Sequence, residues 1–132
     1  MITLVRGLWR ALTEMDRLIR IHFLGASILI SLLGAASVSP RLDGRVLAGL
    51  LAVTLCFHIF SYVLNDVVDL PVDRTQPSRS RDPLVRGAVR AWQALVLALL
   101  QVPVALAITR WLGGGAIAYA ALGCAFALMT AY

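Results

Sequence analysis

Four polar side chains with a regular spacing are the part of this sequence best suited to chemistry: Asn65, Asp66, Asp69 and Asp73. An α-helix turns about 100° per residue, so on a helix all four would fall within an arc of roughly 100° and point the same way. Clustered carboxylates repel one another, and the arrangement therefore requires a cation. Hard oxygen ligands at an open site suit Mg²⁺, which proteins usually hold with one or two carboxylates together with phosphate oxygens.

Arginines follow this acidic stretch at once, namely Arg74, Arg79, Arg81 and Arg86. Guanidinium groups suit phosphate because they form paired hydrogen bonds with it. Carboxylates, a divalent cation and arginines together describe a clamp for a diphosphate, which would stabilise the charge that develops as the diphosphate leaves. The alternative is a solvated loop whose aspartates and arginines pair with one another. The i, i+3, i+7 spacing of the acids favours the clamp.

Pro71 lies between Asp69 and Asp73. Proline has no backbone N–H to donate, so it should bend a helix at this point. The bend could turn Asp73 in a new direction, and Asp73 is therefore the acid whose role depends most on the local geometry.

The elements that must position these residues are membrane spans. Charged residues make up 14% of the 132 residues and hydrophobic residues 60%, whereas a soluble domain carries about 25% charged residues. Lipid offers the backbone no water to bind, so each apolar block should be a helix. We predict an all-α fold, a transmembrane helical bundle forming a single membrane domain over residues 1–132. Its four spans, near the length of about 20 residues that crosses a bilayer core, are residues 21–38, 46–64, 91–109 and 112–132.

The twelve arginines indicate how the bundle is oriented. Nine lie before the first span or in the charged loop at residues 65–90, and four spans place these two regions on the same side. Cytoplasmic loops carry an excess of basic residues, so we expect the N-terminus and this loop to face the cytoplasm. The net charge of +5 could suggest nucleic acid, but the arginines lie at the ends of apolar blocks. They are typical of topology signals and headgroup contacts, and we predict no nucleic-acid partner.

The segment before the first span has its own apolar stripe. A stripe of this kind is typical of a helix that lies on the membrane surface. Its members are Leu4, Leu8, Leu12, Met15 and Leu18.

The acidic stretch resembles the NDxxDxxxD motif, the first aspartate-rich motif of the UbiA-type intramembrane prenyltransferases. A second segment, residues 81–87, reads Arg-Asp-Pro-Leu-Val-Arg-Gly and is similar to the R-P-L-x-x-G segment that follows this motif in the family, with Asp82 as an insertion. The placement after the second span also fits. The resemblance runs from about residue 17 to the end of the chain, and it implies the first half of a larger helical bundle.

The resemblance implies Mg²⁺-dependent transfer of a prenyl group from a prenyl diphosphate to an aromatic or other lipophilic acceptor. Carried over to this sequence, it makes Asp66, Asp69 and Asp73 the Mg²⁺ ligands, with Asn65 supporting them. Arg79, Arg81 or Arg86 would bind the diphosphate, and Asp82 leaves the register of these arginines open.

Two aromatic side chains precede the motif on the arc that carries the acids, His58 and Tyr62. A histidine within a span suggests a functional site, so both could line the acceptor pocket, and Tyr62 could also face an allylic cation. The alternative is a hydrogen-bonded packing histidine and an interfacial tyrosine.

The UbiA-type family has a second aspartate-rich motif, but this sequence has no Asp or Glu after Asp82. We therefore expect a partial chain or one piece of a split enzyme, inactive without a missing C-terminal half or a complementary subunit. One competing interpretation is a non-catalytic membrane protein or degenerate paralogue whose acids bind cations or lipid headgroups. Another is a different diphosphate-handling enzyme, but the DGxxAR…GxxxDxxxD pattern of the CDP-alcohol phosphotransferases is absent.

Overall fold

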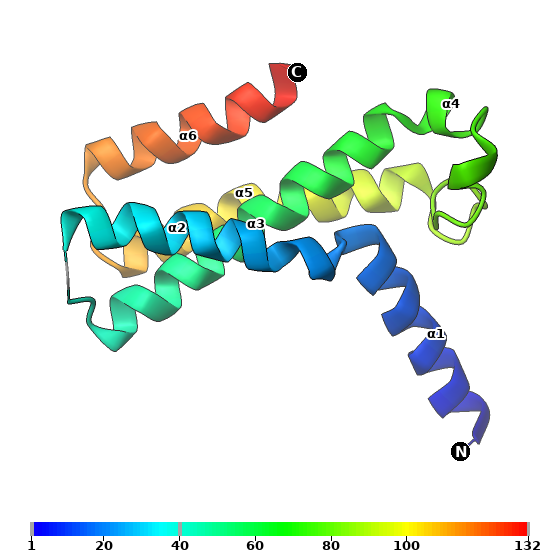
Figure 1. Ribbon diagram of the computed structural model, residues 1–132, viewed down its shortest axis with the longest axis horizontal. Coiled ribbons are helices and arrows are strands. Elements are labelled where there is room, and N and C mark those ends of the chain that lie inside the picture. The colour runs from blue at the N-terminus through cyan, green and yellow to red at the C-terminus, as the bar shows by residue number, and fades with distance from the viewer. Residues whose placement is uncertain (1, 40, 132) are drawn as a thin grey trace.

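The computed structural model describes residues 2–39 and 41–131, and their side chains apart from those of residues 2–4 and 10. Within these ranges the chain forms helices and turns and no β-strand, which confirms the predicted all-α fold. The longer helices (Figure 1) are α1 (Ile2–Ile19), α2 (Leu24–Val38), α3 (Gly44–Val68), α5 (Ala91–Trp111) and α6 (Ala116–Ala131). The short helical turns are η1 (Ile21–Phe23), α4 (Leu70–Asp73) and η2 (Pro77–Arg79).

Three helical segments are long and apolar enough to cross a membrane, which confirms the predicted helical membrane bundle. They are Ile21–Val38, Gly44–Val68 and Ala91–Trp111. The fourth apolar helix, α6, has 16 residues and begins at Ala116 rather than at Leu112. The reason is a tight turn after α5 in which Gly113 has a φ of 78°, a left-handed conformation that glycine adopts without strain. Tyr132, the predicted end of the fourth span, lies outside the described residues.

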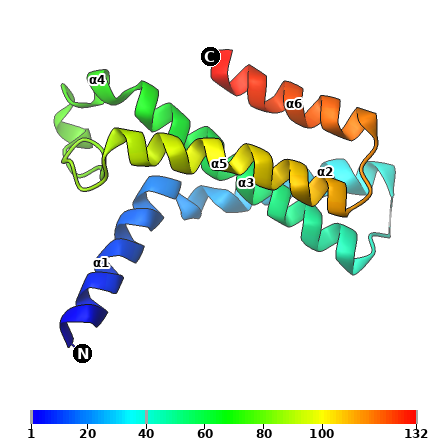
Figure 2. The same ribbon diagram turned by 180° about the vertical axis from the view of Figure 1, so that it is seen from behind.

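Helices α3 and α5 lie side by side along most of their length, as opposite views of the molecule show (Figures 1 and 2). The buried side of α5 carries three completely buried alanines, Ala94, Ala98 and Ala105. Small side chains let two helix backbones approach closely, which favours helix association within a membrane. The larger members of the core come mostly from α3, where Phe60 and Val63 are almost fully buried. Close packing of α3 on α5 therefore forms the centre of the bundle.

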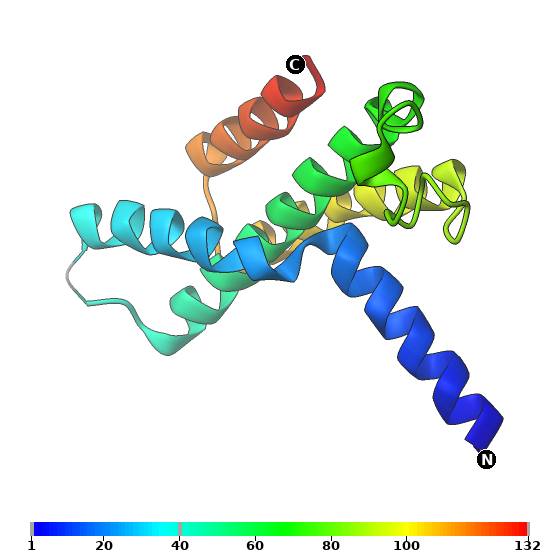
Figure 3. The same cartoon turned by 45° about the vertical axis from the view of Figure 1, so that its right-hand side comes forward.

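Helix α1 leaves the bundle at a steep angle (Figures 1 and 3). It ends at Ile19, and the next residue, Arg20, has φ 55° and ψ 51° and turns the chain into η1. The end of α1 packs on the bundle, since Leu18 is fully buried and Met15 lies against the core. Farther from the junction, Leu8 and Leu12 are exposed. The predicted apolar stripe is thus divided between the bundle and an exposed face, while the Leu4 side chain lies outside the described residues.

The charged loop folds into a compact cap at the end of α3 (Figures 1 and 3). Pro83 and Leu84 are buried, and the Pro83 carbonyl oxygen accepts hydrogen bonds from the backbone N–H groups of Ala88 and Val89. Gly87, with a φ of 75°, closes this turn. The Pro-Leu-x-x-Gly part of the segment therefore has a structural role, because it folds the loop back toward the start of α5.

The packing of α3 on α5 predicts a large effect for a bulky residue at its centre. We expect Ala98→Leu to destabilise the bundle by roughly 1–3 kcal/mol, because the larger side chain would force the two backbones apart. The measurement is unfolding of the purified chain in mixed detergent micelles. Ala107→Leu, a matched change at an exposed position of the same helix, should have little effect. Equal effects of the two changes would contradict this packing.

Candidate functional site

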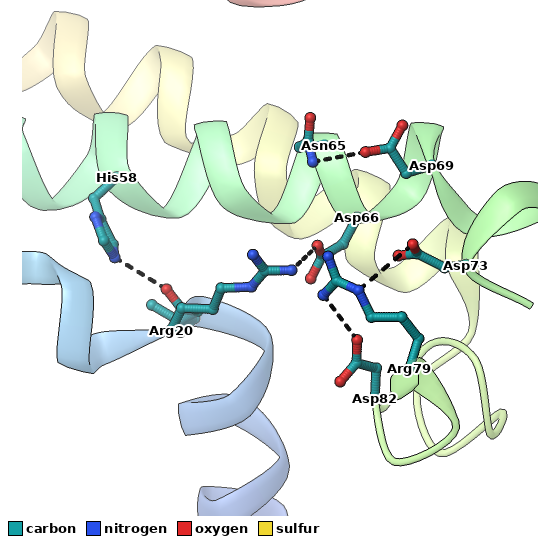
Figure 4. Close-up of polar contacts among 9 residues, drawn as sticks. Arg20, His58, Asn65, Asp66, Asp69, Asp73, Arg79 and Asp82 are labelled. Atoms are coloured by element: carbon teal, nitrogen blue, oxygen red, sulfur yellow. Dashed lines mark hydrogen bonds and ion pairs between the residues drawn. The ribbon is translucent and has the colours of Figure 1, made fainter. Parts of the chain in front are cut away.

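An ion pair joins the N-terminal junction to the acidic stretch. Helix α3 continues to Val68, so Asp66 lies in its last turn. Asp66 is only 8% exposed. The Arg20 guanidinium donates to Asp66 Oδ1 (Figure 4). The same guanidinium lies over the ring of Tyr62, with 5.5 Å between Arg20 Cζ and the ring centroid. A buried carboxylate is costly unless it is paired, and here the arginine that follows α1 is its partner.

A second arginine, Arg79, lies among three carboxylates (Figure 4). Its Nε lies 3.6 Å from Asp73 Oδ1, and its Nη1 donates to Asp82 Oδ2 at 3.1 Å. Burial alone would lower the pKa of Arg79, but the hydrogen bond to Asp82 and the carboxylates of Asp73 and Asp66 outweigh burial and raise the pKa. Asp82, which the sequence comparison treated as an insertion, therefore orients the arginine at the centre of the site.

The remaining two motif residues form a separate pair. Asn65 Nδ2 donates to Asp69 Oδ2 at 2.8 Å, and both residues are exposed, on the other side of the helix from Asp66 and Asp73 (Figure 4). This differs from the single shared face that the spacing predicted. The turn of the helix explains the two pairs: Asp69 lies about 40° from Asn65, whereas Asp66 lies about 100° from Asn65. The backbone N–H of Asp69 still donates to the Asn65 carbonyl oxygen, so the break before α4 comes after Asp69.

A break is present between α3 and α4, and beyond it Asp73 still lies on the side of Asp66 (Figure 4). Within residues 2–39 and 41–131, no three His, Cys, Asp or Glu side chains lie close enough together to hold a metal ion. Asp66 and Asp73, both buried, face the arginines and are the two acids that the structure brings together.

The predicted diphosphate-binding arginines have different surroundings. Arg79 and Arg81 line a pocket of about 390 Å³ at the mouth of the bundle, whereas Arg86 forms an ion pair with Glu14 of α1. The pocket is lined by Arg17, Arg20, His22, Phe23, Arg79, Arg81 and Asp82. Arg17 and Arg20 belong to the arginines that were interpreted from the sequence as topology signals and headgroup contacts. No local spacing could have revealed Arg20, because its partner Asp66 lies 46 residues away along the chain.

His58 connects three elements below this mouth. Its Nε2 lies 3.0 Å from the Ile19 carbonyl oxygen, and its Nδ1 lies 3.0 Å from Ser27 Oγ. A carbonyl oxygen can only accept, so Nε2 carries the proton and Nδ1 accepts from the serine hydroxyl. The ring is almost fully buried and lies 4.5 Å, between centroids, from the Tyr62 ring. Both ring nitrogens of His58 thus have partners within the protein, and the residue also lines a pocket.

Three pockets follow one another from the charged mouth into the bundle. The basic pocket shares Arg20 with a pocket of about 320 Å³ whose lining includes His58 and Tyr62. That pocket in turn shares Ser27 and Phe57 with a third, also of about 320 Å³, which is lined mainly by apolar side chains of α2, α3 and α6. The surroundings thus change from cationic to aromatic to apolar along α3. They match a ligand with an anionic head and an apolar tail.

Comparison with known protein families gives one match. The model of the UbiA prenyltransferase family matches residues 24–132. The searches of curated proteins and of solved structures gave no match. The matched region contains the acidic stretch, the capping loop and helices α2, α3, α5 and α6, while α1 and Arg20 precede it.

The ion pair between Arg20 and Asp66 predicts non-additive effects of substitution. Arg20→Met should destabilise the chain by about 1–3 kcal/mol, because it leaves a mostly buried carboxylate without its partner. Adding Asp66→Asn should recover part of this loss, with a coupling energy of about 0.5–3 kcal/mol in a double-mutant cycle. Thermal unfolding in detergent measures all four forms. The exposed Arg110→Met serves as control, and additive effects would show that the pair contributes nothing.

Proposed function

Because the chain belongs to the UbiA prenyltransferase family, we propose that it binds a prenyl diphosphate and takes part in transfer of the prenyl group to an aromatic or other lipophilic acceptor. The observation that carries this proposal is the row of three pockets, cationic at the mouth and apolar inside. A prenyl diphosphate has the same division, with a multiply charged head and a hydrocarbon chain. The transfer breaks the bond between the prenyl carbon and the diphosphate oxygen, so charge develops at the mouth.

The side chains at the mouth fit a Mg²⁺ ion. The donors are carboxylate and amide oxygens, which Mg²⁺ prefers. Asp66 and Asp73 each meet an arginine through Oδ1, and among the described contacts Oδ2 of each is left for a cation. We assign these two acids as the principal ligands. Asp69 joins them by turning away from Asn65, and Asn65 then supports the site. When bound, Mg²⁺ would neutralise the charge on the leaving diphosphate.

Three of the four arginines that line the basic pocket hold the phosphate oxygens in this proposal. Arg79 and Arg81 were expected from the sequence, and Arg20 is added because its guanidinium lies at the boundary between the basic and aromatic pockets. All three present planar groups of donors that suit phosphate. Arg86 has another task, because its ion pair with Glu14 ties the capping loop to α1.

Tyr62 and His58 form the wall next to the head of the ligand. The Tyr62 ring lines the aromatic pocket with the Arg20 guanidinium over it, and in this proposal it faces an electron-deficient prenyl carbon. His58 uses both ring nitrogens within the protein, so we propose that it positions this wall rather than accepting a proton. The aromatic lining limits access of water, which would otherwise capture the prenyl group.

The orientation follows from the charge distribution. The end of α1 and the capping loop lie at the same end of the bundle (Figure 1), and they contain most of the arginines. We propose that this end faces the cytoplasm, as the excess of basic residues on that side indicates. Membrane lipid then surrounds the apolar helices, and the diphosphate enters from the cytoplasm.

One observation favours a second candidate, a non-catalytic membrane protein whose acids bind a cation or a lipid headgroup. Asp66, Asp73 and Asp82 already have arginine partners, as they would in a loop with no ligand of its own. The two candidates differ in whether the apolar pockets bind a prenyl chain. A site for lipid headgroups would bind the charged group of its ligand alone. The proposed enzyme would also bind the prenyl hydrocarbon that is attached to the diphosphate.

The metal assignment predicts the effect of two conservative substitutions. Asp66→Asn and Asp73→Asn should each weaken Mn²⁺ binding at least about tenfold in the presence of farnesyl diphosphate, a loss typical of residues that support a metal site. Electron paramagnetic resonance of free Mn²⁺ gives the affinity. Asp43→Asn is the matched control, because Asp43 caps the opposite end of α3 and asparagine caps equally well. Affinities equal to that control would reject the assignment.

The absence of any Asp or Glu after Asp82 predicts the activity of the chain. With Mg²⁺ and labelled farnesyl diphosphate, the 132-residue chain alone should form no extractable prenylated product from a panel of aromatic acceptors. Co-reconstitution with a second half that carries the other aspartate-rich motif should give product, and Asp66→Asn should abolish it. Turnover by the chain alone would disprove the need for a second half. No turnover by the complemented, folded form would favour the non-catalytic candidate.

A further inference from the structure

Helix α1 has an apolar face that the bundle leaves uncovered. Val5, Leu8, Trp9 and Leu12 are all more than half exposed, and Trp9 is 72% exposed. At about 100° per residue these four side chains share one side of the helix. Only the last turns of α1, with Met15 and Leu18, reach the core. Four neighbouring apolar side chains on one helix require a partner other than water.

The other side of α1 carries positive charge. Arg6 and Arg17 are exposed and lie 11 residues apart, so on a helix they fall within roughly 20° of each other. Both point more than about 100° away from Leu8 and Leu12, while Arg6 lies about 60° from Trp9 and the exposed Asp16 lies about 20° from Trp9. A helix with an apolar face that contains Trp and Leu and with arginines beside that face is typical of helices that lie in the membrane interface.

Helix α1 packs beside the end of a predicted membrane span, where the interface between headgroups and acyl chains would lie. It crosses the direction of α3 and α5 steeply (Figures 1 and 3). A pocket lined by Met15, Leu18, Ala94 and Leu97 lies between its last turns and the first turns of α5. Trp92, exposed at the start of α5, lies at this level, and exposed tryptophans at the ends of spans mark the interface.

We propose that α1 is an interfacial anchor whose partner is the anionic phospholipid surface at the capping-loop end of the bundle. Val5, Leu8, Trp9 and Leu12 enter the boundary between headgroups and acyl chains, and Arg6 and Arg17 bind the lipid phosphates. Trp92 and Leu95 are also exposed on the first turns of α5. The proposal is independent of prenyl transfer, and α1 precedes the region that matches the family. Through Arg20, which follows α1, the lipid also fixes one wall of the basic pocket.

Fluorescence of Trp9 in the full chain tests this proposal. Trp92→Phe and Trp111→Phe leave Trp9 as the single reporter, and the chain is reconstituted into phosphatidylcholine vesicles with or without phosphatidylglycerol. We expect lipids brominated near the top of the acyl chain to quench Trp9 more strongly than deeply brominated lipids, and more strongly when phosphatidylglycerol is present. Arg6→Gln and Arg17→Gln should each lower the ratio of docked to undocked α1 by about fivefold in the anionic vesicles.

Two controls make the outcome decisive. Arg110→Gln removes the same charge at the opposite end of α5 and should leave Trp9 quenching unchanged. A variant with Trp92 alone should be quenched by shallow bromines whether or not phosphatidylglycerol is present, which confirms a folded, inserted bundle. Quenching of Trp9 by aqueous acrylamide but not by bromolipid would overturn the proposal. Protection of Trp9 from both quenchers would also overturn it, because a protein, such as a second copy of this chain, would then cover the face.

Discussion

Close approach of α3 and α5 is the constraint on which the rest of this structure depends. Lipid is as apolar as leucine, so burial of leucine against leucine gives little drive for two helices to associate in a membrane. Alanines on α5 solve the problem by letting the backbones come together. The same packing sets the separation between the end of α3 and the start of α5. The charged loop must bridge that separation, and its buried Pro83 and Leu84 hold the bridge in one conformation.

Two buried carboxylates, Asp66 and Asp73, lie where the charged loop meets the apolar bundle. Each buried carboxylate at the end of the bundle has a guanidinium partner, and the two partners come from different parts of the chain, one before the first span and one from the capping loop. Removal of a single partner leaves an uncompensated charge, which costs more than loss of both. The ion pairs therefore hold the N-terminal junction, the end of α3 and the loop together as one unit.

Composition and local spacing were enough to predict the helical bundle and the acidic stretch, because both depend on neighbours in the sequence. The bend at Pro71 was also predictable, but its effect was not. Helical hydrogen bonding continues to Asp69, and beyond the break Asp73 stays on the side of Asp66, which is where a continuous helix would also place it. Arg20 could not be found in this way, because its role arises only when α1 and α3 meet in space. The same holds for Ile19, whose contribution to the site is a backbone carbonyl oxygen. No side-chain pattern encodes such a group.

The arginine–carboxylate pairs have a consequence for how two ligands would bind. Before any ligand arrives, Arg20 and Arg79 already neutralise Asp66 and Asp73. A metal ion that came alone would have to compete with the guanidinium groups, and a diphosphate that came alone would have to compete with the carboxylates. When both arrive, each takes the partner that the other releases. Under the proposed function, affinity for the metal and affinity for the diphosphate are thus thermodynamically linked, and each ligand tightens the binding of the other by the same factor.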